Sequence, residues 1–425
     1  MWSDASRYGL ALLPMFALFA LAGSLPAQEA CCRAEGLDIA ERYRAEGLED
    51  RRFTHAELWR VLTPALRSDR VGVTRLGASL EGRAINAVTF GTGPTTVLLW
   101  SQMHGDESTA TMALADIVHW LATGPEDDVL RRRLEERLTV TMIPMLNPDG
   151  AERFVRENAA GIDINRDARR TATPEGRILK AVRDSIEADF GFNLHDQGTY
   201  AAGEGGALVA IALLAPAADE ERSWGPVRER ARGVAAAIAA ALAPDLAGRL
   251  ARYDDGYAPR AFGDNMQAWG TSTVLIESGI LPDDPQKQEL RRLNVVALVS
   301  ALDAIAAGGA EASGTAAYDR LPWNRRVEND LLLLGGTLVP AGAAPVRADV
   351  AIRFDDSAAR TGPRYGEIGD LEGVVAVDTV DATGLFLHAD VEGEGVVRPG
   401  VPVRISARRG ANPASETAWA LGVKD

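Results

Sequence analysis

Apolar runs of strand length alternate with stretches of helical spacing through most of the first 307 residues. The expected strands cover residues 95–100, 138–144, 190–194, 207–214 and 273–276, and residues 71–90 alternate in strand fashion around the segment 80–83. The expected helices cover residues 108–121, 175–188, 225–242 and 286–307, and a polar stretch over 34–68 also reads as helical. Strands that alternate with helices favour a sheet covered by helices on both faces. We therefore predict an α/β domain over residues 50–307, with a mainly parallel mixed sheet sandwiched by helices.

The pattern changes after this domain. A linker over residues 308–317 is followed by short β-type runs at 331–339, 348–354, 374–380, 385–391 and 401–407, with Gly, Pro and Asp between them. Such spacing is typical of a small sandwich or barrel. We assign residues 318–425 to a C-terminal all-β domain.

An apolar run over residues 9–23 follows Arg7 and precedes small residues at 24–27. This layout is typical of a secretory signal peptide, and the run is too short for a confident membrane-spanning helix. We predict a signal peptide over 1–27, a tail or helix over 28–49, and a secreted or periplasmic protein. After removal of the signal, no stable membrane insertion is expected.

Cys31 and Cys32 are the only cysteines in the chain. Adjacent cysteines rarely bridge each other, so no disulfide framework is expected. Lipid anchoring at Cys31 is an alternative to a free soluble chain. It is disfavoured because the segment 28–30 lacks the apolar residue that such processing sites usually contain.

The charge of the chain narrows its partners. Lys and Arg number 45 and Asp and Glu number 60, which gives a net charge of −15. An acidic surface repels a phosphate backbone, so no nucleic-acid partner is expected. The chain contains five histidines, and any metal site that uses imidazole must draw on this small set.

Two of these histidines stand in patterns that suit a metal. His104 and Glu107 lie three residues apart at a strand-to-helix junction, so that one turn can direct both side chains to one ion. His195 directly follows an apolar strand, where a distant third ligand is expected. Imidazole and carboxylate suit Zn²⁺, which in catalytic sites takes three protein ligands and keeps one open position.

Other polar residues follow the same logic. Glu277 ends an apolar strand, where a carboxylate is costly unless it is paired, hydrated or catalytic. Asn165 and Arg166 offer an amide beside a planar fork, and this pair is well suited to holding a carboxylate.

At these residues the sequence resembles the zinc carboxypeptidase family. The blocks that carry the resemblance occur in the family's order at 79–85, 104–107, 147–150, 161–166 and 192–195, and Glu277 follows. The resemblance implies one Zn²⁺ held by His104, Glu107 and His195. It also implies that Asp163 orients His104, and that Glu277 is the general base that activates water.

The resemblance assigns the remaining roles as well. Arg156 would stabilise the oxyanion, and Asn165 and Arg166 would hold the substrate's terminal carboxylate. Tyr257 is aligned, across a gap, with the family's mobile tyrosine. The implied partner is a peptide with a free C-terminal carboxylate, and the implied activity is hydrolysis of its last peptide bond.

Three alternatives stay open. The short interval between Glu107 and His195 approaches that of the family's deacylase branch, so a zinc-dependent deacylase or amidase of N-acyl amino acids is the second hypothesis. A non-catalytic peptide- or glycan-binding module is the third, although the full set of ligands and base argues against it. Asp196, beside the third ligand, either selects a basic substrate group or serves as a structural hydrogen-bond acceptor.

Overall fold

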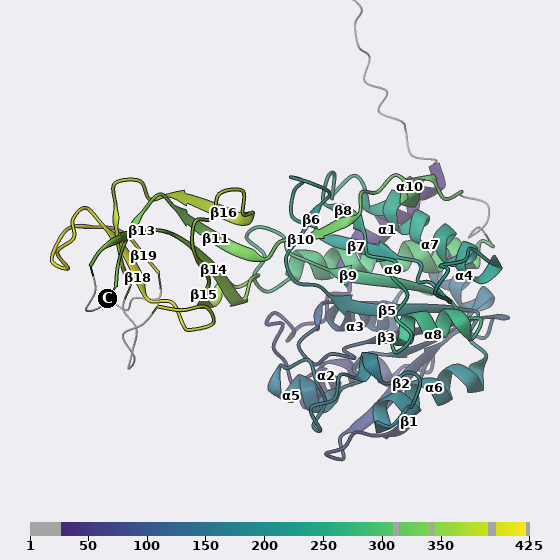
Figure 1. The fold of residues 1–425 in the computed structure, drawn as a ribbon. Coiled ribbons are helices and arrows are strands. Elements are labelled where there is room, and N and C mark those ends of the chain that lie inside the picture. Colours follow the sequence, from purple (N-terminus) through teal and green to yellow (C-terminus); the bar gives the residue numbers. More distant parts are fainter. Residues whose placement is uncertain (1–26, 309–313, 341–343, 390–396, 422–425) are drawn as a thin grey trace, which may run out of the picture.

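The computed structural model describes residues 27–308, 314–340, 344–389 and 397–421. An eight-stranded sheet with its helices forms the larger lobe, and two smaller sheets form a second lobe beside it (Figure 1). The predicted α/β fold with additional β structure is confirmed. The predicted signal peptide lies almost wholly outside the described residues. No helix within the described ranges has the length and apolar character needed to cross a membrane.

The large sheet is mixed, with its parallel strands at the centre. The spatial order is β1 (Val71–Ala78), β2 (Ala84–Phe90), β4 (Leu138–Ile143), β3 (Thr95–Ser101), β5 (Phe190–Asp196), β9 (Ser272–Ser278), β7 (Ile211–Leu214) and β8 (Leu250–Arg252). Strands β4, β3, β5 and β9 run parallel, whereas β2 and β7 join this group antiparallel. The carboxyl ends of β3, β5 and β9 therefore meet at one edge of the sheet.

Both faces of this sheet are buried. Successive residues of β3 contact opposite cores, with Val97 and Leu99 on one face and Leu98 and Trp100 on the other. Buried residues of α1 (Ala27–Arg42), α2 (His55–Leu62), α3 (Thr109–Thr123), α4 (Val129–Arg137), α7 (Pro226–Leu242) and α9 (Gln288–Ala306) join the first core. The second core is closed by α6 (Pro174–Ile186) and α8 (Phe262–Ala268). Continuous apolar strands are the expected consequence of such two-sided burial.

Two expectations for the larger lobe were wrong, and one short helix was not predicted. The polar stretch over 34–68 is two helices, because Gly47 takes φ +92° and Thr54 starts α2 with a capping box to Glu57. The expected strand over 207–214 begins only at Ile211. The turn after β4 continues into a short unpredicted helix, α5 (Pro148–Arg153), which the Asn147 side chain caps through the Gly150 amide.

The second lobe contains two sheets around its own core. One has the order β15 (Thr361–Gly369), β14 (Asp349–Asp356), β11 (Asn329–Leu334) and β16 (Ala376–Asp381); the other has β13 (Val346–Arg347), β12 (Thr337–Val339), β17 (Phe386–Ala389), β18 (Ile405–Arg408) and β19 (Thr417–Leu421). The expected strand over 331–339 is two strands in different sheets, because Gly335 turns the chain at φ +74°. Two short elements precede this lobe, α10 (Ala316–Asp319) and β10 (Asn324–Arg326).

A buried ion pair links the N-terminal part of the chain to the large lobe. Arg291 in α9 donates to Asp116 in α3 at 2.6 and 2.8 Å, and both side chains are 1% exposed. Arg291 also donates to the carbonyl oxygens of Ala45 and Leu48, which lie in the non-helical segment between α1 and α2. The guanidinium therefore ties three separate segments together.

We predict that Asp116→Asn lowers the free energy of unfolding by about 3–5 kcal/mol, because it leaves the Arg291 charge buried without its partner. Urea denaturation followed by circular dichroism measures the change. The control is Asp184→Asn, which removes an exposed ion pair to Lys180 and should cost at most about 1 kcal/mol. Equal losses in the two variants would contradict the prediction.

Candidate metal centre and active site

His104, Glu107 and His195 converge at the carboxyl edge of the large sheet. His104 lies three residues after β3, in a segment where Gln102 takes φ +50°. A turn bonds the Glu107 amide to the His104 carbonyl at 3.2 Å, and α3 begins two residues later. His195 is the second-to-last residue of strand β5. All three residues are buried, and they are the one group of His, Cys, Asp and Glu in the described residues that could hold a metal ion.

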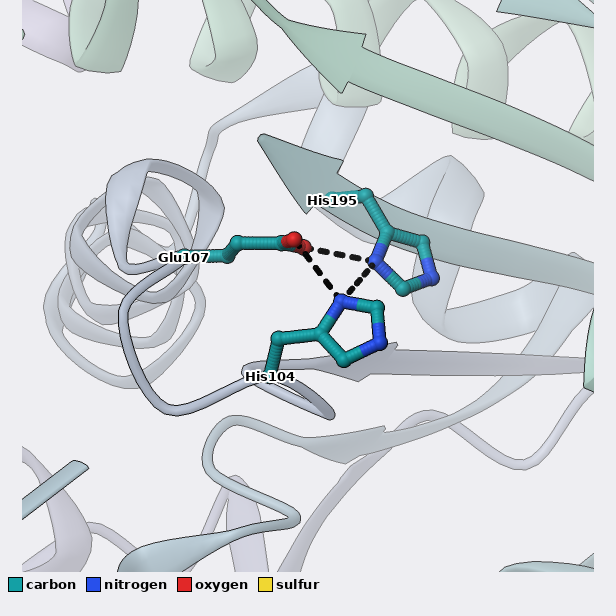
Figure 2. Close-up of side chains that lie close together, drawn as sticks. All are labelled: His104, Glu107 and His195. Carbon is teal, nitrogen blue, oxygen red and sulfur yellow. Dashed lines mark hydrogen bonds and ion pairs between the residues drawn. The ribbon is translucent and has the colours of Figure 1, made fainter. Parts of the chain in front are cut away.

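The potential ligand atoms of this triad face one another (Figure 2). The two Glu107 oxygens lie 2.7 Å from the Nδ1 atoms of His104 and His195, and these two nitrogens are 3.2 Å apart. Around a tetrahedral Zn²⁺, donors about 2.0–2.2 Å from the metal lie about 3.3 Å from each other. The triad therefore matches a zinc site in donor chemistry and nearly in spacing, with one open position.

Asp163 and Arg156 complete the surroundings of His104. Asp163 caps a short 3-10 turn, η2 (Ile164–Arg166), and its Oδ1 lies 3.1 Å from the Nε2 atom of His104. Arg156 donates to Asp163 Oδ2 at 2.9 and 3.1 Å, and its Nη1 lies 3.2 Å from Glu107 Oε1. A carboxylate on the second ring nitrogen fixes the tautomer and the orientation of a metal-binding imidazole.

The electrostatics of the triad reflect this crowding. Burial alone would lower the pKa of His104, but the charge of Glu107 and the hydrogen bond to Asp163 raise it to about 9. Burial lowers the pKa of His195, which favours the neutral imidazole that metals bind. For Asp163, the penalty of burial is outweighed by the contacts with His104 and Arg156, which hold its pKa well below the ordinary value. A divalent cation would replace the proton that His104 shares with Glu107.

Glu277 stands beside the triad because of strand register. In the parallel pairing of β5 with β9, Glu277 lies opposite His195. The side chain is 8% exposed, accepts no hydrogen bond from the described residues and lines the same pocket as the triad. Burial and the negative charge of Glu107 raise the pKa of Glu277 well above its ordinary value. A cation at the triad would offset that rise.

Asn165 and Arg166 lie at the opposite end of η2 from Asp163. Asn165 accepts a hydrogen bond from the Phe262 amide at 2.8 Å, and its Nδ2 is 3.4 Å from His195 Nε2. Arg166 donates to the Asn165 carbonyl, and its side chain is otherwise exposed at the pocket. The guanidinium is therefore accessible to an anionic group.

The pocket around these residues has a volume of about 470 Å³, within the range of sites that enclose small molecules. Its wall contains Tyr200 and Tyr253, whose ring centroids are 5.9 Å apart, and burial together with the charge of Glu277 raises the pKa of Tyr253. Neither tyrosine was predicted from the sequence as a site residue. Tyr253 directly follows β8, and three residues were too few to reveal that strand. Tyr257 lies in the same loop, partly buried, and only its neighbours Gly256 and Ala258 line the pocket.

Asp196 is committed to structural contacts. Its Oδ2 accepts from the Thr109 hydroxyl at 2.7 Å and from the Lys287 ammonium at 3.1 Å, and the side chain is 6% exposed. The Asp196 amide donates to Glu107 at 3.1 Å. Of the two alternatives, the structural acceptor is therefore favoured, because Lys287 already balances the carboxylate charge.

Comparison with known proteins gives a consistent result. Residues 59–191 match the sequence model of a family described as zinc carboxypeptidase. The chain is 31% identical to an uncharacterized protein of Zymomonas mobilis over 129 residues, which are 29% of this chain and 33% of that protein. It is 32% identical to carboxypeptidase D of Mus musculus over 142 residues, or 28% and 10% of the two chains. The matches thus span a third or less of these relatives.

The fold also has a counterpart among solved structures. Thrombin-activatable fibrinolysis inhibitor superposes with a TM-score of 0.50 at 14% identity, over 65% of this chain and 80% of that one. This likeness concerns the fold. The family match includes His104, Glu107, Arg156 and Asp163 but ends before His195 and Glu277.

We predict that His195→Ala loses its Zn²⁺ on dialysis, because only two of three ligands remain, whereas the unchanged protein keeps one ion per chain. Asp163→Asn should keep the site but bind zinc about 10–100-fold more weakly. Elemental analysis and competition with a chromogenic chelator measure both effects. His119→Ala, which removes a histidine bonded to the Val61 carbonyl and outside the pocket of the triad, is the control. Full zinc retention in His195→Ala would contradict the assignment.

Proposed function

Because residues 59–191 match the zinc carboxypeptidase family, we propose that this chain is a member of it and a metallocarboxypeptidase that hydrolyses the last peptide bond of a peptide with a free C-terminal carboxylate. The single observation that carries the proposal is the position of Glu277, an unpaired buried carboxylate next to His195 in the pocket of the triad. A metal-binding module without catalysis has no need of a free carboxylate at such a cost.

The residues that would hold the metal are His104, Glu107 and His195. A bound Zn²⁺ would supply a Lewis acid for the scissile carbonyl and acidify a water molecule at its open position. The protein groups around it would do the rest of the work. Asp163 keeps the His104 ring oriented, so that the ligand set is preformed.

Glu277 would take a proton from the attacking water and deliver it to the nitrogen of the leaving amino acid. Its raised pKa suits both halves of this transfer, because a very acidic carboxylate holds a proton too weakly to carry it. Arg156 lies at Glu107 Oε1 and would donate to the oxygen that becomes negative as the carbonyl is attacked. Its side chain is 38% exposed, so substrate can reach it.

Asn165 and Arg166 would hold the terminal carboxylate of the substrate. An arginine fork binds a carboxylate through two parallel hydrogen bonds, and the neighbouring amide adds a third donor. Because Asn165 is tied to the amide at the start of α8, this grip would have a fixed position relative to His195. A fixed grip selects the last peptide bond over internal ones.

An N-acyl amino acid offers the same carboxylate and amide, so the same groups could act on it. The peptide is favoured because the pocket continues past the triad to residues of the second lobe, such as Arg353 and Phe354. A small acyl group would not extend into this part of the pocket. We also propose, from the apolar segment over 9–23, that the enzyme acts after export.

We predict that Glu277→Gln lowers kcat by about 10²–10⁴-fold, because the amide cannot accept the proton from water. Zinc content should stay at one ion per chain, since Glu277 is not a ligand. Release of the C-terminal residue from a blocked dipeptide, with metal analysis on the same sample, measures both. Glu289→Gln, on the exposed side of α9, is the matched control and should keep full activity. Activity retained in Glu277→Gln would refute the mechanism.

We predict that Arg166→Ala lowers kcat/KM by about 10–100-fold, mainly through KM, because hydrogen bonds to a charged group contribute about 1.5–3 kcal/mol. The same peptide with an amidated C-terminus lacks the carboxylate. On that substrate the variant and the unchanged enzyme should be equally slow. If Arg166→Ala had the same effect on both substrates, Arg166 would not contact the carboxylate.

A further inference from the structure

The chain that leads into the second lobe pairs with the segment that follows His195. Strand β10 (Asn324–Arg326) pairs antiparallel with β6 (Tyr200–Ala202), only a few residues after His195. The Val327 amide continues this pairing to the Thr199 carbonyl at 3.0 Å. Strands β6 and β10 thereby form a separate two-stranded sheet, which joins the large lobe to the chain that enters the β lobe.

Two side-chain contacts strengthen this first attachment. Asn324 donates to the Gln197 side chain at 3.2 Å. Asp330, which is 7% exposed, accepts from the Phe354 amide at 2.7 Å and from the Thr199 hydroxyl at 3.4 Å. The loop after His195 is thus fixed to β14 as well as to β10.

A second attachment lies on the other side of the metal centre. Asp356, at the end of β14, forms ion pairs with Arg51 and Arg52 of the catalytic lobe. The Arg52 guanidinium also stacks over Phe154 at 4.6 Å, two residues before Arg156. The Arg51 carbonyl accepts from Ser108, the neighbour of Glu107. One attachment therefore reaches the His195 side of the site and the other reaches the Arg156 and Glu107 side.

The space between the attachments is continuous with the catalytic pocket. Arg326 at the end of β10 and six residues that follow it line the pocket that holds the triad and Glu277: Val327, Glu328, Asp330, Arg353, Phe354 and Ser357. A second cavity of about 590 Å³ shares Glu107, Arg156 and Gln197 with the first and is bounded by Asp355, Asp356 and Ser357 of the β lobe. The Gln197 Nε2 atom is buried there without a hydrogen-bond partner among the described residues.

The direction of a bound peptide follows from these positions. If its terminal carboxylate is at Asn165 and Arg166 and its scissile bond is at the triad, the preceding residues must leave the triad away from that grip. Asn165 and Arg166 line the first pocket but not the second cavity. The preceding residues therefore enter space that Ser357 and its neighbours enclose from the β lobe.

We propose that the C-terminal β lobe is a wall of the substrate site that restricts the enzyme to short peptides, chiefly dipeptides and tripeptides. This inference rests on the proposed function. The free Gln197 amide is placed to donate to the backbone of the residue before the scissile bond. A longer chain must pass between the two attachments of the β lobe, and the Asp356 ion pairs hold that passage closed.

The test compares an N-acetylated dipeptide with a decapeptide that ends in the same two residues. For the unchanged zinc enzyme, kcat/KM should be at least about tenfold higher on the dipeptide, because steric exclusion acts on the longer competitor alone. Asp356→Asn should raise kcat/KM on the decapeptide about tenfold or more and leave the dipeptide within about twofold. Asp378→Asn removes an ion pair to Arg360 within the same lobe and should change neither rate.

A second variant acts in the opposite direction and does not depend on opening the lobe. Ser357→Trp adds bulk at a partly exposed position that lines both cavities. It should lower kcat/KM on a tripeptide more than on the dipeptide. Equal rates of the unchanged enzyme on dipeptide and decapeptide would overturn the length restriction while leaving the proposed function intact.

Binding separates the two proposals further. Zinc-loaded Glu277→Gln is titrated calorimetrically with the same two peptides, so that no turnover is needed. Binding of the dipeptide at least about tenfold more tightly than the decapeptide supports the wall even if hydrolysis fails. Equal binding of both peptides would overturn it. Absence of hydrolysis in the unchanged enzyme, by contrast, counts only against the peptidase activity.

Discussion

The parallel register of β3, β5 and β9 is the constraint on which the site depends. Backbone hydrogen bonds place Ser101 opposite Leu194 and His195 opposite Glu277, so that metal ligands and the free carboxylate reach one edge together. Side chains alternate along a strand, and a slip of one residue would turn His195 into the core and Leu194 into the pocket. The two apolar cores oppose any such slip, because every central strand is buried on both faces.

That edge also concentrates more acidic groups than a buried region ordinarily tolerates. Glu107, Asp163 and Glu277 lie around His104 and Arg156, and each of the three carboxylates interacts with both of these groups. A divalent ion at the triad would offset these charges, so metal affinity and the state of the Glu277 proton would be coupled. Asp196 is paired with Lys287, although its charge still contributes to the raised pKa of Glu277.

The candidate site residues could be predicted from the sequence better than the structure around them. His104, Glu107, His195 and Glu277 were found because each ends or follows an apolar strand, and parallel strands bring their ends together. The prediction of one helical stretch over 34–68 was wrong because the local pattern does not show where a helix ends. The positive φ of Gly47 and the capping box at Thr54 divide this stretch into two helices. Tyr253 was not predicted because the short strand before it, β8, is recognisable only from its pairing with β7.

The contribution of the β lobe could not be foreseen for a different reason. Asp330 and Ser357 line the pocket because the two lobes contact each other. The hydrogen bond from Thr199 to Asp330, for example, joins residues that are more than 130 positions apart in the chain. The family match ends at residue 191, before His195, Glu277 and the whole second lobe. The match therefore includes only part of the candidate metal centre, and the wall that the β lobe adds to the pocket lies wholly outside it. The pocket is a property of the joined lobes, since residues of both line it and neither lobe alone encloses it.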